Sequence, residues 1–182
     1  MTSSNSGATD GPGVEVIVLG SGGHSAVLIS ALHHLGIEIL GVTSRETSRG
    51  AEILGIRIIG DDEEIFGKSA LATVLVNGIG MPTAGLSRRH MCAERMRNKG
   101  YSFLTVLDSQ AVIAQGVDLA EGVQVLCGAV IQPRTKIGRD SIVNTGATID
   151  HDCEIGENCH IAPGATLAGN VKVGKGTLIG VG

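Results

Sequence analysis

The stretch that decides the fold is residues 111–182, which divides into the units AVIAQG, VDLAEG, VQVLCG, AVIQPR, TKIGRD, SIVNTG, ATIDHD, CEIGEN, CHIAPG, ATLAGN, VKVGKG and TLIGVG. Every unit begins with a small or short residue and carries an aliphatic residue at its third position. Those third positions are Ile113, Leu119, Val125, Ile131, Ile137, Val143, Ile149, Ile155, Ile161, Leu167, Val173 and Ile179. A six-residue period with one inward aliphatic side chain predicts short strands that stack on copies of themselves. We therefore expect a parallel β-helix.

Three such units close one triangular coil, so the region predicts four coils whose strands lie about 4.8 Å apart. Glycines recur late in the units, as at Gly116 and Gly128, where sharp corners need a positive φ. The chain stops at the end of a unit with no capping helix. Because solenoid ends normally need caps, we expect the C-terminal end of the β-helix to be incomplete.

The preceding segment has the pattern of an α/β domain. Residues 14–20 form an apolar run that leads into the glycine-rich turn GSGGHS, an apolar-periodic helix that ends at Gly36, and a second strand over residues 37–42. Further elements are expected at residues 74–76 (strand), 84–99 (helix) and 102–106 (strand). This βαβ order predicts a Rossmann-like domain. The expected organisation is a disordered tail over residues 1–13, the Rossmann-like domain over 14–108 and the β-helix over 109–182.

The glycine-rich turn suits an anion better than a dinucleotide. The dinucleotide motif GxGxxG requires glycine where this chain has Ser25, and no acidic residue follows the second strand. The amides of Gly22, Gly23 and His24 would still stand at a helix N-terminus, where phosphate binds readily. The alternative is a tight structural turn that happens to be rich in glycine.

Composition excludes several functional classes. One Tyr, two Phe and no Trp leave no stacking surface for single-stranded nucleic acid, and a net charge of −4 gives no basic footprint. No apolar stretch approaches ~18 residues and the start of the chain is polar, so neither a membrane span nor a signal peptide is predicted. We expect a cytoplasmic protein with reduced thiols at Cys92, Cys127, Cys153 and Cys159.

The order of the GSGGHS turn and the segment NTGATIDHDCEIGENCHIAPGATLAGN, residues 144–170, resembles the PglD/NeuD-type sugar acetyltransferases. These belong to the hexapeptide-repeat (left-handed β-helix) acyltransferase family. The resemblance implies left-handed coils, a nucleotide sugar held by the N-terminal domain, and acetyl-CoA bound between the subunits of a homotrimer. The implied function is acetyl-CoA-dependent acetylation of a nucleotide-activated amino sugar or sialic acid in bacterial surface-glycan biosynthesis. Both N- and O-acetylation, and the identity of the sugar and the nucleotide, remain open.

The resemblance also implies roles for individual residues. His151 matches the catalytic base, and Asp152 matches an acidic residue that raises its basicity. The acetyl-CoA site corresponds to His160, Asn144, Gly169 and Val181. The loop that holds the phosphates of the sugar nucleotide corresponds to Gly22, Gly23, His24 and Gly80. Relatives that use UDP-sugars tend to carry an acidic pair after the second strand, and here the sequence at residues 43–45 is TSR.

Acyl-transfer chemistry gives an independent reason to consider these residues. Attack on a thioester needs a base that works near neutral pH and donors for the developing oxyanion. A histidine oriented by a carboxylate supplies the base, as His151 beside Asp152 would. His160 falls in the same coil but nearly a whole face away, roughly 15–20 Å at ~3.3 Å per residue. If both histidines serve one reaction, they must come from different subunits.

Two alternatives compete with this interpretation. The γ-type carbonic anhydrases bind zinc on the same kind of prism, with two histidines about five residues apart and a third upstream. Residues 111–182 contain only two histidines, nine apart, so no metal is expected. The other alternative is a trimeric scaffold without activity, formed by a truncated or degenerate β-helix.

Overall fold

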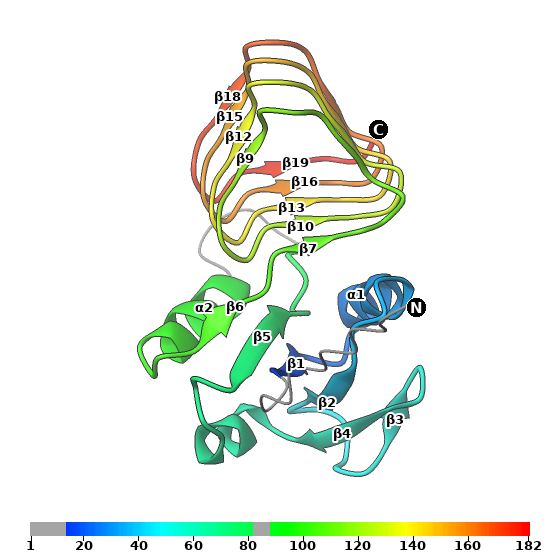
Figure 1. The fold of residues 1–182 in the computed structure, drawn as a ribbon, viewed down its shortest axis with the longest axis vertical. Coiled ribbons are helices and arrows are strands. Elements are labelled where there is room, and N and C mark those ends of the chain that lie inside the picture. Colours follow the sequence, from blue (N-terminus) through cyan, green and yellow to red (C-terminus); the bar gives the residue numbers. More distant parts are fainter. Residues whose placement is uncertain (1–13, 82–87) are drawn as a thin grey trace, which may run out of the picture.

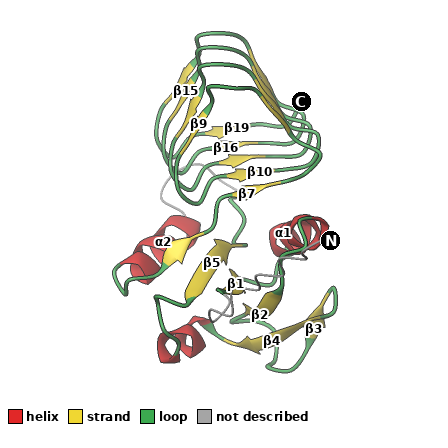
Figure 2. Cartoon of the chain, in the orientation of Figure 1, coloured by secondary structure: helices red, strands yellow, loops and turns green. Residues whose placement is uncertain are grey.

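The computed structural model describes residues 14–81 and 88–182, so the expected tail at residues 1–13 and the start of the helix predicted at 84–99 lie outside the described residues. Figure 1 shows a three-sided prism of stacked coils beside an α/β unit. Figure 2 shows helices in the α/β unit, while the prism consists of short strands and loops. No helix in the described ranges combines the length and the apolar character needed to cross a bilayer.

The α/β unit is built on a six-stranded sheet with the order β3-β4-β2-β1-β5-β6. The β1-α1-β2 unit is present, and β1 pairs in parallel with both β2 and β5. The hairpin β3–β4, which the sequence pattern did not predict, adds the one antiparallel pair of this sheet. The elements are β1 (Glu15–Leu19), α1 (Gly23–His34), β2 (Ile39–Thr43), β3 (Glu52–Ile53), β4 (Ile56–Gly60), the 3-10 helix η1 (Asp62–Gly67), β5 (Thr73–Asn77), α2 (Arg88–Arg97) and β6 (Ser102–Phe103).

Helices cover both faces of this sheet. On one face, Leu28 and Leu32 of α1 pack against Val18 and Val76. On the other face, Met96 of α2 and residues of η1 pack against Leu75. The cluster under α1 also includes Ile142 and other residues of the prism, so α1 lies between the sheet and the prism.

The prism confirms the predicted β-helix. Its strands pair in parallel at steps of 18 residues, as in a left-handed β-helix of hexapeptide repeats, and form three faces. The first face consists of β7 (Val106–Leu107), β10 (Gln124–Val125), β13 (Ile142–Val143), β16 (His160–Ile161) and β19 (Leu178–Ile179). The second consists of β8 (Val112–Ile113), β11 (Val130–Ile131), β14 (Thr148–Ile149) and β17 (Thr166–Leu167). The third consists of β9 (Asp118–Leu119), β12 (Lys136–Ile137), β15 (Glu154–Ile155) and β18 (Lys172–Val173).

The prism begins earlier than the first recognised unit. The strand expected at residues 102–106 is two strands: β6 pairs with β5, whereas β7 pairs with β10 of the prism. Residues 105–110, TVLDSQ, form one more unit, with Thr105 first and Leu107 third. The Thr105 hydroxyl donates to the Ala120 carbonyl, and Thr135 and Ser141 bond the carbonyl 15 residues ahead in the same way. This bond explains why the first position is often a short polar residue.

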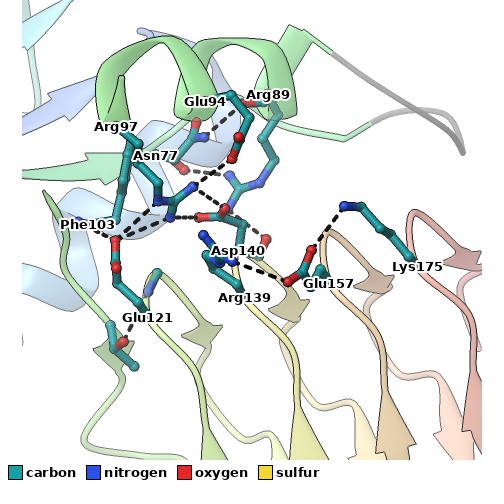
Figure 3. Close-up of polar contacts among 12 residues, drawn as sticks. Asn77, Arg89, Glu94, Arg97, Phe103, Glu121, Arg139, Asp140, Glu157 and Lys175 are labelled. Atoms are coloured by element: carbon teal, nitrogen blue, oxygen red, sulfur yellow. Dashed lines mark hydrogen bonds and ion pairs between the residues drawn. The ribbon is translucent and has the colours of Figure 1, made fainter. Parts of the chain in front are cut away.

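A polar joint fixes the α/β unit to the prism. Arg97 of α2 pairs with Asp140 at a prism corner, with an N–O distance of 2.6 Å. The neighbouring Arg89 is fully buried, and its guanidinium donates to the carbonyls of Asn77, Ile79 and Asp140. Figure 3 shows both arginines reaching from α2 to the prism. The joint holds the loop after β5 against the prism, where that loop forms one wall of the candidate site.

Candidate active site

His151 lies at the prism corner that follows β14. Its backbone amide donates to Asp150 Oδ1, and its Nδ1 lies 2.7 Å from Asp152 Oδ2. A carboxylate only accepts hydrogen bonds, so Nδ1 carries a proton, and in the neutral tautomer Nε2 has the free lone pair. None of the described residues engages Nε2, and the side chain is 55% exposed. The corner therefore presents an imidazole whose Nε2 is open and can act as a base when it carries no proton.

Asp152 is held as a carboxylate by the coil before it. Arg134 Nε and Nη2 donate to its two oxygens at 2.6 and 2.7 Å. These hydrogen bonds, followed by the one from His151, hold the pKa of Asp152 well below its usual range. The contact arises because residues 18 apart stack in a three-unit coil. Asp152 is thus ionised throughout the neutral range.

Gly169, on the coil that follows, leaves room for the His151 ring. A Cβ built at Gly169 would lie 2.7 Å from His151 Cε1 and 2.8 Å from Nε2. The φ of Gly169 lies outside the left-handed region, so the lack of space, not backbone strain, disfavours a side chain here. The ring of His151 is therefore fixed by Asp152 at Nδ1 and by Gly169 at its open edge.

The variant Gly169→Ala is expected to displace the His151 ring while the fold persists. We expect kcat for acetyl transfer to fall roughly 10- to 100-fold, because misplacing a reacting group by about 1 Å costs about that much. The melting temperature should stay close to that of the unmodified protein. Gly174→Ala is the matched control, since a Cβ there meets only one atom, at 3.9 Å. Equal turnover in the two variants would show that the ring position does not matter.

A cavity of about 800 Å³ lies between the start of α1 and another corner of the prism. This volume is typical of ligand sites. The cavity joins the glycine-rich turn, the loop after β5, and the corners that follow β13 and β16. The described residues that line it are Gly22, Gly23, His24, Val27, Ile79, Gly80, Met81, Arg88, Asn144, Thr145, His160 and Pro163.

The glycine-rich turn is fixed by Ser25. Its hydroxyl donates to the carbonyls of Gly20 and Gly78 at 2.5 and 3.0 Å. Helix α1 begins at Gly23 after the N-cap Gly22, which has no side-chain cap, so its first-turn amides are available to an anion. A second cavity of about 160 Å³ continues past the turn toward Ser44 and Arg45.

His24 is half-buried and neutral. Gln124 Nε2 donates to the Asn77 carbonyl at 2.9 Å, so Gln124 Oε1 accepts the proton of His24 Nε2 at 2.8 Å. Burial, and then the nearby Arg89, lower the pKa of His24 to about 4. At neutral pH this residue can offer an anion its backbone amide but no positive side-chain charge.

His160 is also neutral, because burial lowers its pKa. Its Nδ1 donates to the Met81 carbonyl at 3.1 Å, so Nε2 accepts from Asn144 Nδ2 at 2.9 Å. Asn144 Oδ1 accepts the Thr145 amide at 2.8 Å, which fixes the orientation of the carboxamide. The second N–H of Asn144 Nδ2 has no partner among the described residues.

The residues predicted from the sequence fall into two groups at two different prism corners. His151, Asp152 and Gly169 share one corner. The other group lines the large cavity: Gly22, Gly23, His24, Gly80, Asn144 and His160. Val181 lines neither, is 77% exposed, and stands 18 residues after Pro163 on the same corner as that residue. Within one chain, the structure does not bring His151 to the cavity.

Sequence reasoning missed several residues of the site. Gln124 and Met81 contact the two half-buried histidines, His24 and His160, from segments 100 and 79 residues away, and no local signal marks them. Arg134 could have been found, because the 18-residue step of the coil places it next to Asp152. In residues 14–81 and 88–182, no cluster of three or more His, Cys, Asp or Glu side chains is arranged to hold a metal ion.

The family described as bacterial transferase hexapeptide (six repeats) matches residues 134–169 and 152–182. A mutant of perosamine N-acetyltransferase from Caulobacter crescentus, solved with CoA and GDP-perosamine, is 32% identical with a TM-score of 0.83, over 92% of this chain and 78% of that one. The acetyltransferase domain of PglB from Neisseria gonorrhoeae, solved with acetyl coenzyme A, is 26% identical with a TM-score of 0.83, over 93% of this chain and 80% of that one.

WeeI from Acinetobacter baumannii shares the fold at 21% identity, with a TM-score of 0.79 over 92% of this chain and 78% of that one. Curated protein sequences gave no match. The chain belongs to the hexapeptide-repeat acyltransferases, among the sugar acetyltransferases of the PglD/NeuD type.

Proposed function

We propose that this protein transfers the acetyl group of acetyl-CoA to a nucleotide-activated amino sugar or sialic acid used in bacterial surface-glycan biosynthesis. The observation that carries the proposal is the His151 corner, where Asp152 sets the tautomer of the imidazole and Nε2 is left open. The neighbours solved with CoA and GDP-perosamine support the two ligand classes. The α/β unit would act as a Rossmann-like domain that holds the nucleotide, and the reaction would take place in the cytoplasm.

The active unit would be a homotrimer, because one subunit holds only half of the site. The three prism faces differ: one is covered by the α/β unit, and one displays the charged residues Asp118, Lys136, Glu154 and Lys172. The third displays uncharged side chains, Val112, Val130, Thr148 and Thr166. Depletion of charge is typical of an interface core. The uncharged face lies between the His151 corner and the Asn144 corner, so copies that meet through it would bring His151 of one subunit to the cavity of the next.

The chemistry assigned to each residue follows from this placement. Acetyl-CoA would supply an acetyl group activated as a thioester. His151 Nε2 would take the proton from the attacking amine or hydroxyl of the sugar and return it to the departing thiolate. The second N–H of Asn144 would donate to the thioester carbonyl oxygen, where negative charge develops. His160 would hold Asn144 in position, and Val181 would lie along the path of the cofactor.

The phosphates of the sugar nucleotide would bind at the start of α1. A Cβ added at Gly23 meets no atom within 4 Å, so a side chain there would extend into open space rather than into the protein. We expect Gly23→Val to fold normally and to weaken nucleotide-sugar binding at least tenfold, with acetyl-CoA affinity unchanged. Calorimetry with each ligand separates the two effects. Unchanged affinity for the sugar nucleotide would remove this turn from the site, and equal loss of both ligands would indicate a folding defect.

The experiment that tests the function is a screen for acetyl-CoA-dependent thiol release. GDP-, UDP-, CMP- and dTDP-linked amino sugars would be offered with acetyl-CoA, and the products examined by mass spectrometry for an added acetyl group. We expect turnover with at least one nucleotide class, and the product would distinguish N- from O-acetylation. Binding of acetyl-CoA without turnover of any acceptor would contradict the proposal and favour the scaffold alternative.

A further inference from the structure

Arg134 contacts the proposed base only through Asp152. Arg134 Nε and Nη2 donate to the two oxygens of that carboxylate. Asp152 Oδ2 also accepts the hydrogen bond of His151 Nδ1. The backbones of Arg134 and Asp152 both adopt the left-handed region, with φ of 63° and 60°. The Asp152 amide donates to the Pro133 carbonyl, so the two corners are also held together by the backbone. A planar guanidinium that meets a carboxylate in this way fixes its orientation as well as its charge.

We propose that Arg134 is a positioning residue that sets both the orientation and the basicity of His151. This inference rests on the proposed role of His151 as the base. The bidentate pair keeps the plane of Asp152 fixed, which keeps the imidazole aligned. The positive charge of Arg134 also offsets the carboxylate, which by itself would favour the imidazolium. Arg134 therefore acts on His151 through both the position and the charge of Asp152.

The charged groups around His151 identify Arg134 as the source of the proposed effect on its basicity. Its own corner contributes Asp150 and Asp152. The coil before contributes Arg134 beside the uncharged Gln132 and Pro133, and the coil after contributes the uncharged residues at 168–170. In the proposed trimer, the facing cavity adds Arg88 and two neutral histidines, and none of these changes in the variants below.

The test compares Arg134→Gln and Arg134→Lys with Arg139→Gln, which removes a similar exposed pair with Glu157 at another corner. NMR titration of the His151 ring measures its pKa directly. We expect Arg134→Gln to raise that pKa by about half to one unit, as expected for a unit charge roughly 6 Å away in a largely aqueous setting. Arg134→Lys keeps the charge and should change the pKa little. Both variants should lower kcat roughly 3- to 10-fold, because the bidentate pairing with Asp152 is lost. Arg139→Gln should change neither the pKa of His151 nor kcat.

A second measurement separates positioning from general structural support. If Arg134 acts through Asp152, Arg134→Gln should lower kcat no further in an Asp152→Asn background. The inference is overturned if the His151 pKa moves no more in Arg134→Gln than in Arg139→Gln, or if the loss of kcat is the same in both backgrounds. The proposed function fails separately: a His151→Ala variant with normal turnover would remove the base assignment even where the pKa shift is found.

Discussion

His151→Ala is expected to lower kcat for acetyl transfer on the order of 10²- to 10⁴-fold, the usual cost of removing a general base. The ring is 55% exposed and its removal leaves no buried group unpaired, so the fold should persist. Asp152→Asn should lose less, because Asp152 orients the ring and carries no proton. Steady-state assays of thiol release, with acetyl-CoA binding measured by calorimetry, check both expectations. Acetyl-CoA affinity should remain within about twofold, since the base is needed for the chemical step.

His34→Ala is the matched control, because His34 lies exposed at the end of α1. It should keep full activity and the same melting temperature. Near-normal turnover of His151→Ala in a preparation active with a sugar nucleotide would show that another group takes the proton. The neutral His24 would then be the next residue to test, since it already lines the cavity.

The β-helix was predictable because its energetics are local and repeated. Each unit buries one aliphatic side chain, so an uninterrupted run of third positions was sufficient to predict the strands. The unit at residues 105–110 escaped recognition although it follows the same rule, because Val106 was read as the end of a strand of the α/β sheet. Val106 in fact pairs with Gln124 of the prism. In the α/β unit, the pattern predicted β1, α1, β2 and β5 but missed the hairpin β3–β4, whose short strands carry little periodicity.

The candidate site was predictable in its residue types but only partly in its arrangement. The spacing of His151 and His160 already indicated that the two histidines belong to different half-sites, and the structure places them at different corners. The neutral state of His24 could not be read from the sequence. It depends on burial against the prism and on the nearby Arg89, which is 65 residues away in the sequence and also lowers the pKa of His24. The phosphate-loop prediction therefore changes in one respect, because the amide of residue 24 can contribute but its ring cannot act as a cation.

Two inactive variants are expected to restore each other if the site is shared between subunits. In a mixed oligomer of His151→Ala and Gly23→Val chains, a working site forms wherever the Gly23→Val chain supplies His151 and the His151→Ala chain supplies the cavity. Random 1:1 assembly of a closed ring gives that combination at about one site in four. We therefore expect about a quarter of the unmodified activity at limiting sugar nucleotide, where each parent alone retains at most about a tenth.

Coexpression of the two chains in equal amounts yields the randomly assembled oligomers for the assay, and native mass spectrometry verifies the 1:1 mixing. Unmodified chains mixed with the double variant serve as the control and should also give about a quarter of the activity, because each site then needs two unmodified neighbours. Hybrids that stay at the level of their parents while this control is active would place His151 and the cavity in the same subunit. The uncharged face would then have to meet its neighbour in some other way, or His151 would have to reach the Asn144 corner within its own coil. Recovery to the expected level would instead show that His151 and the start of α1 act on one substrate from two different chains, although the two lie apart within each subunit.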